Sequence, residues 1–132
     1  MMKHEFEALA GYEVSIEDYN KIIEPMYMAT DLNKEDFVKV IDKKRFALPT
    51  KKQMINQMIK KAVEYQQTDD IEVKWEIENL AIQFAYRFYH IDTKLKHWCF
   101  LDVKRHEWTG KIEEIKLQIG KYGIMNEEFR LV

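Results

Sequence analysis

The spacing of apolar residues predicts helices in the first two thirds of the chain. Ser15 has the character of a helix N-cap, and apolar side chains follow it at helical spacing. Pro25 lacks an amide hydrogen and biases Glu24 toward extended geometry, so we expect a kink or break near Glu24. A second helix is expected from its cap, Asn33, to about Asp42, with the basic residues that follow at its carboxyl end.

The clearest helix is predicted to run from Thr50 to about Gln66. Thr50 and Gln53 have the spacing of a capping box, in which each side chain accepts a hydrogen bond from the other residue's backbone N–H. Apolar positions then recur with helical spacing. They are Met54, Ile55, Met58, Ile59, Ala62 and Tyr65.

Residues 71–78 fit two patterns. Apolar and charged side chains alternate strictly there, as they would in a half-buried strand. The apolar positions also continue at helical spacing to Phe88, and Asp69 with Glu72 offers another capping box. Because no turn residue interrupts the run to about Tyr89, we predict a helix and keep the strand as the alternative.

The character of the chain changes after His90, where three stretches favour strands. The expected strands are residues 95–103, 115–119 and 128–132. Gly-Lys-Tyr-Gly at 120–123 predicts a hairpin turn, and Trp-Thr-Gly at 108–110 marks the preceding connection. The prediction is an α+β fold in which about four helices pack on a small three-stranded antiparallel sheet, all within one domain, 1–132.

The composition supports a folded chain without a strong overall charge. Of the 132 residues, 46% are hydrophobic and 33% are charged, which is far from the signature of disorder. Basic and acidic residues number 21 and 23, so an electrostatic function has to be local. The single cysteine and the polar N-terminus favour the cytoplasm, and the apolar stretches are too short to cross a membrane.

Three segments carry a resemblance to a known group of proteins. They are residues 24–29, 45–50 and 86–89. With them the chain, from about Phe6 to its end, resembles small uncharacterised proteins carried by bacteriophages and mobile elements of Gram-positive bacteria. The resemblance implies an accessory protein that binds and disables a host or defence-system protein, for instance as an inhibitor of a CRISPR nuclease (anti-CRISPR type).

Three of the histidines and the only cysteine lie close together in the C-terminal part of the sequence, but their spacing favours neither a metal site nor a catalytic site. His97, Cys99, Asp102 and His106, with nearby His90, contain zinc-ligand atoms, yet the close pairs typical of zinc sites are missing. A cysteine nucleophile would need an imidazole and an oxyanion stabiliser to converge on the thiol. We interpret these residues as packing residues and predict a non-enzymatic protein without a metal or cofactor.

Binding to another protein is the leading functional hypothesis. Methionine and aromatic side chains adapt to partner surfaces and often anchor interfaces. The predicted partner-binding residues are Met26, Tyr27 and Met28 around Pro25, and Trp108 in a loop.

The alternative hypothesis is a nucleic-acid-binding module in the basic region 43–61. Its candidate residues are Lys43, Lys44, Arg45, Lys51, Lys52, Lys60 and Lys61. The predicted connector of about seven residues is longer than a helix-turn-helix turn, which weakens the comparison with that motif. Trp98 and Phe100, beside Lys96, Lys104 and Arg105, could also stack on bases, although a core role is the simpler interpretation.

Overall fold

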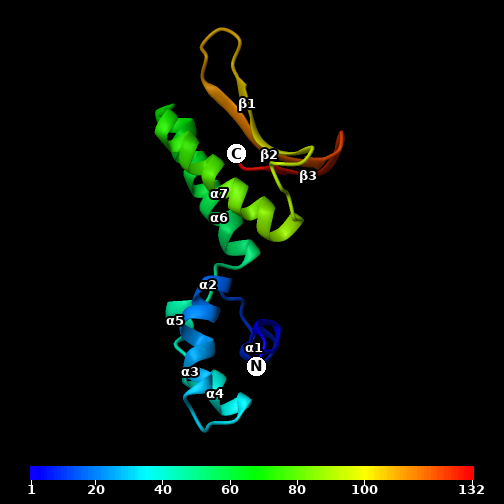
Figure 1. Ribbon diagram of the computed structural model, residues 1–132. Coiled ribbons are helices and arrows are strands. Elements are labelled where there is room, and N and C mark those ends of the chain that lie inside the picture. Colours follow the sequence, from blue (N-terminus) through cyan, green and yellow to red (C-terminus); the bar gives the residue numbers. More distant parts are fainter. The chain divides into compact units, whose positions relative to one another are not determined.

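The computed structural model describes residues 1–132 as two compact units, Met1–Pro49 and Thr50–Val132, and each unit is treated separately below (Figure 1). The chain is α+β, as predicted, with a three-stranded antiparallel sheet at its C-terminal end. It has six helices, not about four, when the continuous run of α2, η1 and α3 is counted as one. The expectation of a single domain stays a prediction.

The N-terminal unit consists of short helices around an aromatic core. These are α1 (Lys3–Ala10), α2 (Ile16–Asp18), η1 (Tyr19–Ile23), α3 (Glu24–Met28), α4 (Lys34–Val40) and α5 (Lys43–Phe46). Phe6 of α1 is fully buried, and its ring centroid lies 6.0 Å from Tyr12, 6.1 Å from Tyr19 and 6.4 Å from Phe37. Val14, Ile23, Ile41 and Phe46 complete the cluster.

Of the break or kink expected near Glu24, the break is wrong, because helical structure continues from Ile16 to Met28. A π-helical stretch, η1, ends at Ile23, two residues before Pro25, and the Glu24 N–H donates to Tyr19 O across this wider turn. Proline interrupts an α-helix because its ring clashes with the carbonyl of the preceding turn and its amide hydrogen is missing. The wider turn changes that spacing, so the chain accommodates Pro25 without leaving the helix.

Two of the extra helices come from residues that were assigned to other elements. Lys43, Lys44 and Arg45 do not end the preceding helix but form α5, in which the Asp42 carboxylate accepts from the Lys44 N–H at 3.0 Å. The chain leaves α4 at Ile41, whose backbone is extended. The N-terminal segment, for which no helix was predicted, forms α1.

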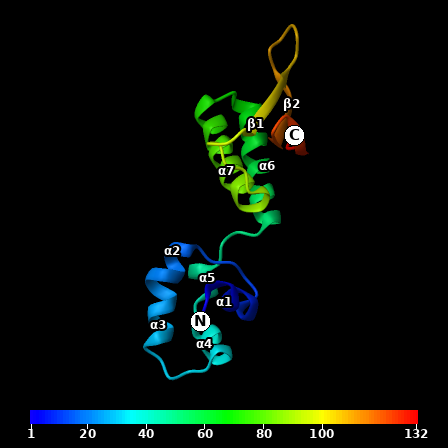
Figure 2. The same cartoon turned by 45° about the vertical axis from the view of Figure 1, so that its right-hand side comes forward.

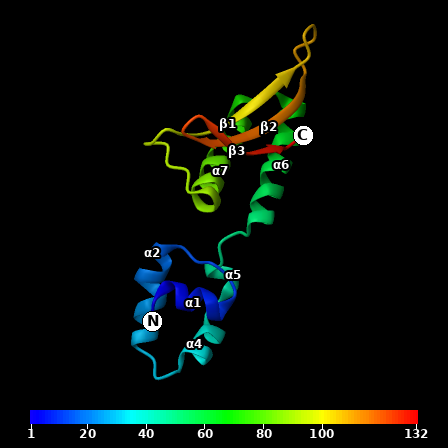
Figure 3. The ribbon, with the colours of Figure 1, turned by 90° about the vertical axis from the view of Figure 1, so that its right-hand side faces the viewer.

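The C-terminal unit is a helical hairpin packed on a sheet. Its elements are α6 (Lys51–Thr68), α7 (Ile71–Tyr89), β1 (His97–Arg105), β2 (Ile112–Lys121) and β3 (Ile124–Arg130). Figure 2 shows α6 and α7 side by side, and in Figure 3 the strands cross over them in the order β1-β2-β3. Within this unit both helices pack on the sheet and share its core, while residues 1–49 have a core of their own.

The structure confirms both long helices. The Thr50–Gln53 capping box forms, with the Gln53 N–H donating to Thr50 Oγ1 at 3.2 Å and the Thr50 N–H to Gln53 Oε1 at 2.9 Å. Residues 71–78 belong to α7 and are not a strand. The cap of α7 is Asp70, whereas Asp69 has a positive φ of 51° and ends α6.

The predicted strands are confirmed with shifted ends, and β2 lies between its two neighbours. Ile115, Leu117 and Ile119 of β2 are fully buried beneath the helices, while the residues between them belong to the opposite face. The predicted turn is confirmed at Tyr122 and Gly123, whose φ angles of 51° and 81° are those of a two-residue type I′ turn.

Candidate functional site

The loop between β1 and β2 presents the most exposed large apolar side chain of the molecule. In Figures 1 and 2 this end of the hairpin extends beyond the neighbouring ends of α6 and α7. The loop position of Trp108 was predicted from the sequence, and 88% of its side chain is exposed. Folded proteins usually bury most of a tryptophan, so this exposure needs an explanation.

The backbone around Trp108 is held by hydrogen bonds that centre on His106. Its Nδ1 accepts from the Trp108 N–H at 3.2 Å and from the Thr109 N–H at 3.1 Å. Its backbone N–H donates to Lys111 O at 2.7 Å, and its carbonyl accepts from the Gly110 N–H at 2.9 Å. Because one ring nitrogen accepts from two successive N–H groups, the imidazole fixes the backbone of the turn at Trp108 and Thr109.

Arg105 fixes the base of the same loop to the end of α6. Its guanidinium makes a two-pronged ion pair with Asp69, at 2.8 and 2.9 Å, and Nη2 also donates to the Tyr65 hydroxyl at 3.1 Å. Nη1 donates further to Gly110 O at 3.0 Å. The hydrogen bonds from Arg105 lower the pKa of the Asp69 carboxyl. A two-pronged ion pair fixes the relative orientation of its two side chains. The loop that carries the exposed indole is therefore ordered.

The other predicted partner-binding residues lie in the N-terminal unit and do not form one surface. Met28 is 74% exposed, and Met26 is also exposed on α3. Tyr27 instead packs on the Phe37 ring, with centroids 5.1 Å apart, and adjoins the aromatic core. Successive helical residues point about 100° apart, so three neighbours on a helix cannot share one face.

The predicted basic region is divided between the two units. Lys43, Lys44 and Arg45 lie in α5, whereas Lys51, Lys52, Lys60 and Lys61 lie in α6. Two of these cations lie over aromatic rings: Lys43 over Tyr12 at 5.8 Å and Lys51 over Tyr89 at 4.9 Å.

Lys61 is engaged by acidic neighbours. Its Nζ lies 2.6 Å from Glu76 Oε2 and 3.6 Å from Glu64 Oε2. The hydrogen bond that Lys61 donates to Glu76, together with the charge of Glu64, raises the pKa of Lys61. Its positive charge is already balanced by these two carboxylates, so it is less available to a phosphate than the charge of an unpaired lysine.

The histidines and the cysteine of β1 do not converge. His97 Nδ1 accepts from the Asp92 N–H at 2.8 Å and its ring packs edge-on to Tyr122, while His106 lies beyond the other end of β1. Burial raises the pKa of the Cys99 thiol to about 11, so the reactive thiolate is scarce at neutral pH. No three His, Cys, Asp or Glu side chains are placed to hold a metal ion.

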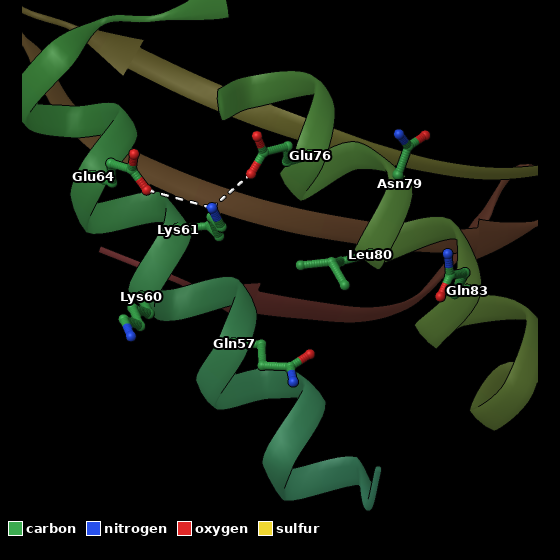
Figure 4. A pocket seen from close by; sticks show the side chains of 8 residues that line it. All are labelled: Gln57, Lys60, Lys61, Glu64, Glu76, Asn79, Leu80 and Gln83. Carbon is green, nitrogen blue, oxygen red and sulfur yellow. Dashed lines mark ion pairs between the residues drawn. The ribbon is translucent and has the colours of Figure 1, made fainter. Parts of the chain in front are cut away.

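A groove of about 580 Å³ lies between α6 and α7, and no sequence signal pointed to it (Figure 4). Its lining consists of Gln57, Lys60, Lys61, Glu64, Glu76, Asn79, Leu80 and Gln83. The two lysines and two glutamates balance in charge, and the only apolar side chain is Leu80. The groove offers hydrogen bonds to a ligand but presents no nucleophile.

Trp98 and Phe100, which the sequence suggested as residues that could stack on bases, belong to a partly apolar area on the open face of the sheet. Trp98 lies over Gly120, and Phe100 and Met125 are exposed on the strands either side of β2. The strict alternation of β2 could have indicated this face, because every second residue of a strand points away from the core. Charged pairs such as Lys116 with Glu114, 3.1 Å apart, occupy the rest of it.

No helix combines the length and the apolar character that crossing a bilayer requires. Comparisons with known proteins found no family model, no curated protein and no solved structure that matches the chain.

Proposed function

We propose that this chain is a non-enzymatic binding protein that attaches to another protein, with Trp108 as an anchor. The supporting observation is a tryptophan that is 88% exposed on a loop held by His106 and Arg105. Tryptophan is among the residues that contribute most to protein interfaces. An ordered loop loses little conformational entropy on binding, so more of the indole's burial energy is available for affinity.

The class of partner follows from the resemblance to small proteins of bacteriophages and mobile elements. It makes a host or defence-system protein the proposed target, with inhibition of a CRISPR nuclease as the specific form. In this role the chain works by stoichiometric attachment. Met26 and Met28, which are exposed on α3, remain proposed contact residues of the N-terminal unit.

Capture from a lysate of a Gram-positive bacterium, treated with nuclease, tests the proposal. The immobilised wild-type chain is expected to retain a discrete protein, and Trp108→Ala is expected to lose it. The affinity of the captured protein should fall at least about 30-fold, which is typical of a central tryptophan in an interface. Ile124→Ala, at an apolar position of similar exposure on β3, is the matched control and should retain the partner. Equal retention by wild type and Trp108→Ala would contradict the proposal.

The role of loop order can be tested separately at His106. His106→Asn keeps an acceptor oxygen close to the position of Nδ1, so the Trp108 and Thr109 N–H groups keep a partner. His106→Ala removes that acceptor and should weaken partner binding more than His106→Asn does. Equal affinities of the two variants would show that loop order does not contribute.

Nucleic-acid binding is the alternative, and one observation favours it. Lys44, Lys52 and Lys60 are exposed and make no ion pair within the chain. If this function is right, Lys51→Glu with Lys52→Glu weakens oligonucleotide binding and lowers its dependence on salt. Unchanged binding would contradict the alternative. Retention of nucleic acid alone in a parallel capture without nuclease would favour it.

A further inference from the structure

The long helix α7 has a second apolar face in addition to the one that it buries. Val73, Ile77 and Phe84 point into the core of the C-terminal unit. A different set lies at helical spacing on the opposite side and is 46–68% exposed. This outer stripe consists of Ile71, Trp75, Ile82 and Tyr86. A surface helix normally has polar residues there, so the two apolar pairs on this side, Ile71 with Trp75 and Ile82 with Tyr86, mark an interaction surface.

The outer stripe is symmetric about its own centre. Trp75 and Ile82 lie at equal distances along the helix from the point between residues 78 and 79, and so do Ile71 and Tyr86. The apolar positions therefore have the same spacing when α7 is followed in either direction. A chance set of exposed residues, or a site for an unrelated partner, does not require such symmetry.

We propose that the outer stripe binds the outer stripe of a second copy of this chain, with the two α7 helices antiparallel. A two-fold axis through the centre places Trp75 opposite Ile82 of the second copy, and Ile71 opposite Tyr86 of the second copy. Both copies then use the same surface, which is the arrangement in most symmetric dimers. At 1.5 Å per residue the stripe is about 22 Å long, which is short for an interface, so we expect a weak dimer with a dissociation constant on the order of micromolar.

The polar residues at the centre are compatible with this axis. Glu78 and Asn79 flank the stripe on opposite sides, because neighbouring helical residues point about 100° apart. The carboxamide of Asn79 has both donors and an acceptor, so it can pair with its own copy across the axis. Glu78 approaches its copy with like charge, and Lys74 of the same helix, 3.8 Å away, offsets part of that repulsion.

Sedimentation equilibrium of the full chain, from about 5 to 500 µM, tests the proposal in the expected affinity range. Wild type is expected to shift from the mass of one chain to that of two. Trp75→Glu and Ile82→Lys should each weaken the dimer at least about 30-fold. Val63→Lys replaces an apolar residue of similar exposure, 39%, on α6 outside the stripe, and it should leave the dimer intact. A wild type that remains a single chain, or a control that dissociates equally, overturns the proposal.

The double variant Trp75→Glu with Ile82→Lys tests the antiparallel arrangement. In it the introduced carboxylate lies opposite the introduced ammonium of the second copy, so dimerisation should recover relative to either single variant. A parallel pair would bring like charges together, and no recovery would overturn the antiparallel assignment. Glu78→Gln should tighten the dimer a few-fold by removing a like-charge pair. Trp108→Ala should leave the dimer intact, so this proposal and the proposed function can fail separately.

Discussion

Both units of the chain bury aromatic and aliphatic side chains in a core, but they do so with different secondary structure. In residues 1–49 short helices surround Phe6, and most of the ring contacts join residues that are distant in sequence. In residues 50–132 two long helices cover one face of a three-stranded sheet. A long helix carries its own caps and periodicity, whereas a short helix depends on tertiary contacts for its stability. The second unit is therefore the more strongly encoded by its local sequence.

The unfolding of the two units can be followed separately, because their tryptophan content differs. The chain has three tryptophans, Trp75, Trp98 and Trp108, and all belong to the C-terminal unit. Tryptophan fluorescence therefore reports on residues 50–132, while far-ultraviolet circular dichroism reports on helices of both units. Coincident transitions by the two probes are expected of a single cooperative domain.

The largest expected effect comes from removing one buried ring in each unit. Phe37 and Phe84 are both almost fully buried, and Phe→Ala in such a core costs about 3–5 kcal/mol in the free energy of unfolding. Phe84→Ala should lower the urea midpoint measured by tryptophan fluorescence. If the sequence prediction of one domain is right, Phe37→Ala lowers the fluorescence midpoint as well.

The Phe37→Ala result decides how the units are coupled. A fluorescence midpoint that stays at the wild-type value while the circular dichroism transition moves or splits would contradict a single cooperative domain. Phe84→Ala serves as the control here, because it must move the fluorescence transition under either arrangement.

A smaller effect is expected from adding one methyl group to a glycine in each unit. A Cβ at Gly120 would lie 2.0 Å from Cζ2 of Trp98, so Gly120→Ala must displace the indole ring. Overpacking of this kind costs about 1–3 kcal/mol. Gly11, which ends α1, has a φ of 81° and open space around it, so Gly11→Ala costs only the conformational penalty of about 1–2 kcal/mol.

Trp98 fluorescence distinguishes the two causes. Gly120→Ala is expected to shift the emission maximum of the native protein, because the ring leaves its place on the strand. Gly11→Ala should leave the native spectrum unchanged. An unchanged spectrum for Gly120→Ala would mean that Trp98 does not rest on Gly120.

Secondary structure was predicted from the sequence more accurately in the second unit than in the first. Both long helices were predicted because caps and apolar spacing agreed, as at Thr50 with Gln53. The helices of the first unit were predicted less well, since a break or kink was expected near Pro25 and the helix continues there through a π-helical turn. That turn depends on how the helix packs, and no local pattern in the sequence specifies it.

At the candidate site, the loop position of Trp108 was predictable from the sequence, but the hydrogen bonds that support the loop were not. Trp108 was expected in a loop, and its exposure agrees with that expectation, while its role in binding stays a prediction. The hydrogen bonds of Arg105 could not be foreseen, because they join the loop to Tyr65 and Asp69, which are remote in sequence. Those that His106 accepts are local, but no spacing in the sequence specifies them. The outer stripe around Trp75 was not predicted, because the apolar spacing of residues 73–88 was assigned to the buried face alone.

Each unit has a helix whose N-cap side chain accepts a hydrogen bond from the backbone three residues later, so the two caps can be compared. Asn33 Oδ1 accepts from the Asp36 N–H at 2.8 Å, and Thr50 Oγ1 accepts from the Gln53 N–H at 3.2 Å. Replacing either cap with alanine should cost about 1 kcal/mol in the free energy of unfolding. Thr50→Ala should lower the fluorescence midpoint, whereas Asn33→Ala does so only if the units unfold together. Asn33→Asp, which keeps the acceptor, is the control and should remain near wild type.

The smallest effect is expected from removing a tyrosine hydroxyl in each unit, because the two hydroxyls differ in their partners. The Tyr12 hydroxyl is buried without a hydrogen-bond partner, and burial together with the charge of Asp42 raises its pKa. Tyr12→Phe removes an unpaired polar group, so the free energy of unfolding should stay within about 0.5 kcal/mol of wild type or rise. Tyr65 instead accepts from Arg105 at 3.1 Å, so Tyr65→Phe should destabilise the second unit and loosen the Trp108 loop. Urea denaturation followed by circular dichroism measures both, and a Tyr12→Phe protein less stable than Tyr65→Phe would reverse this assignment of the two hydroxyls.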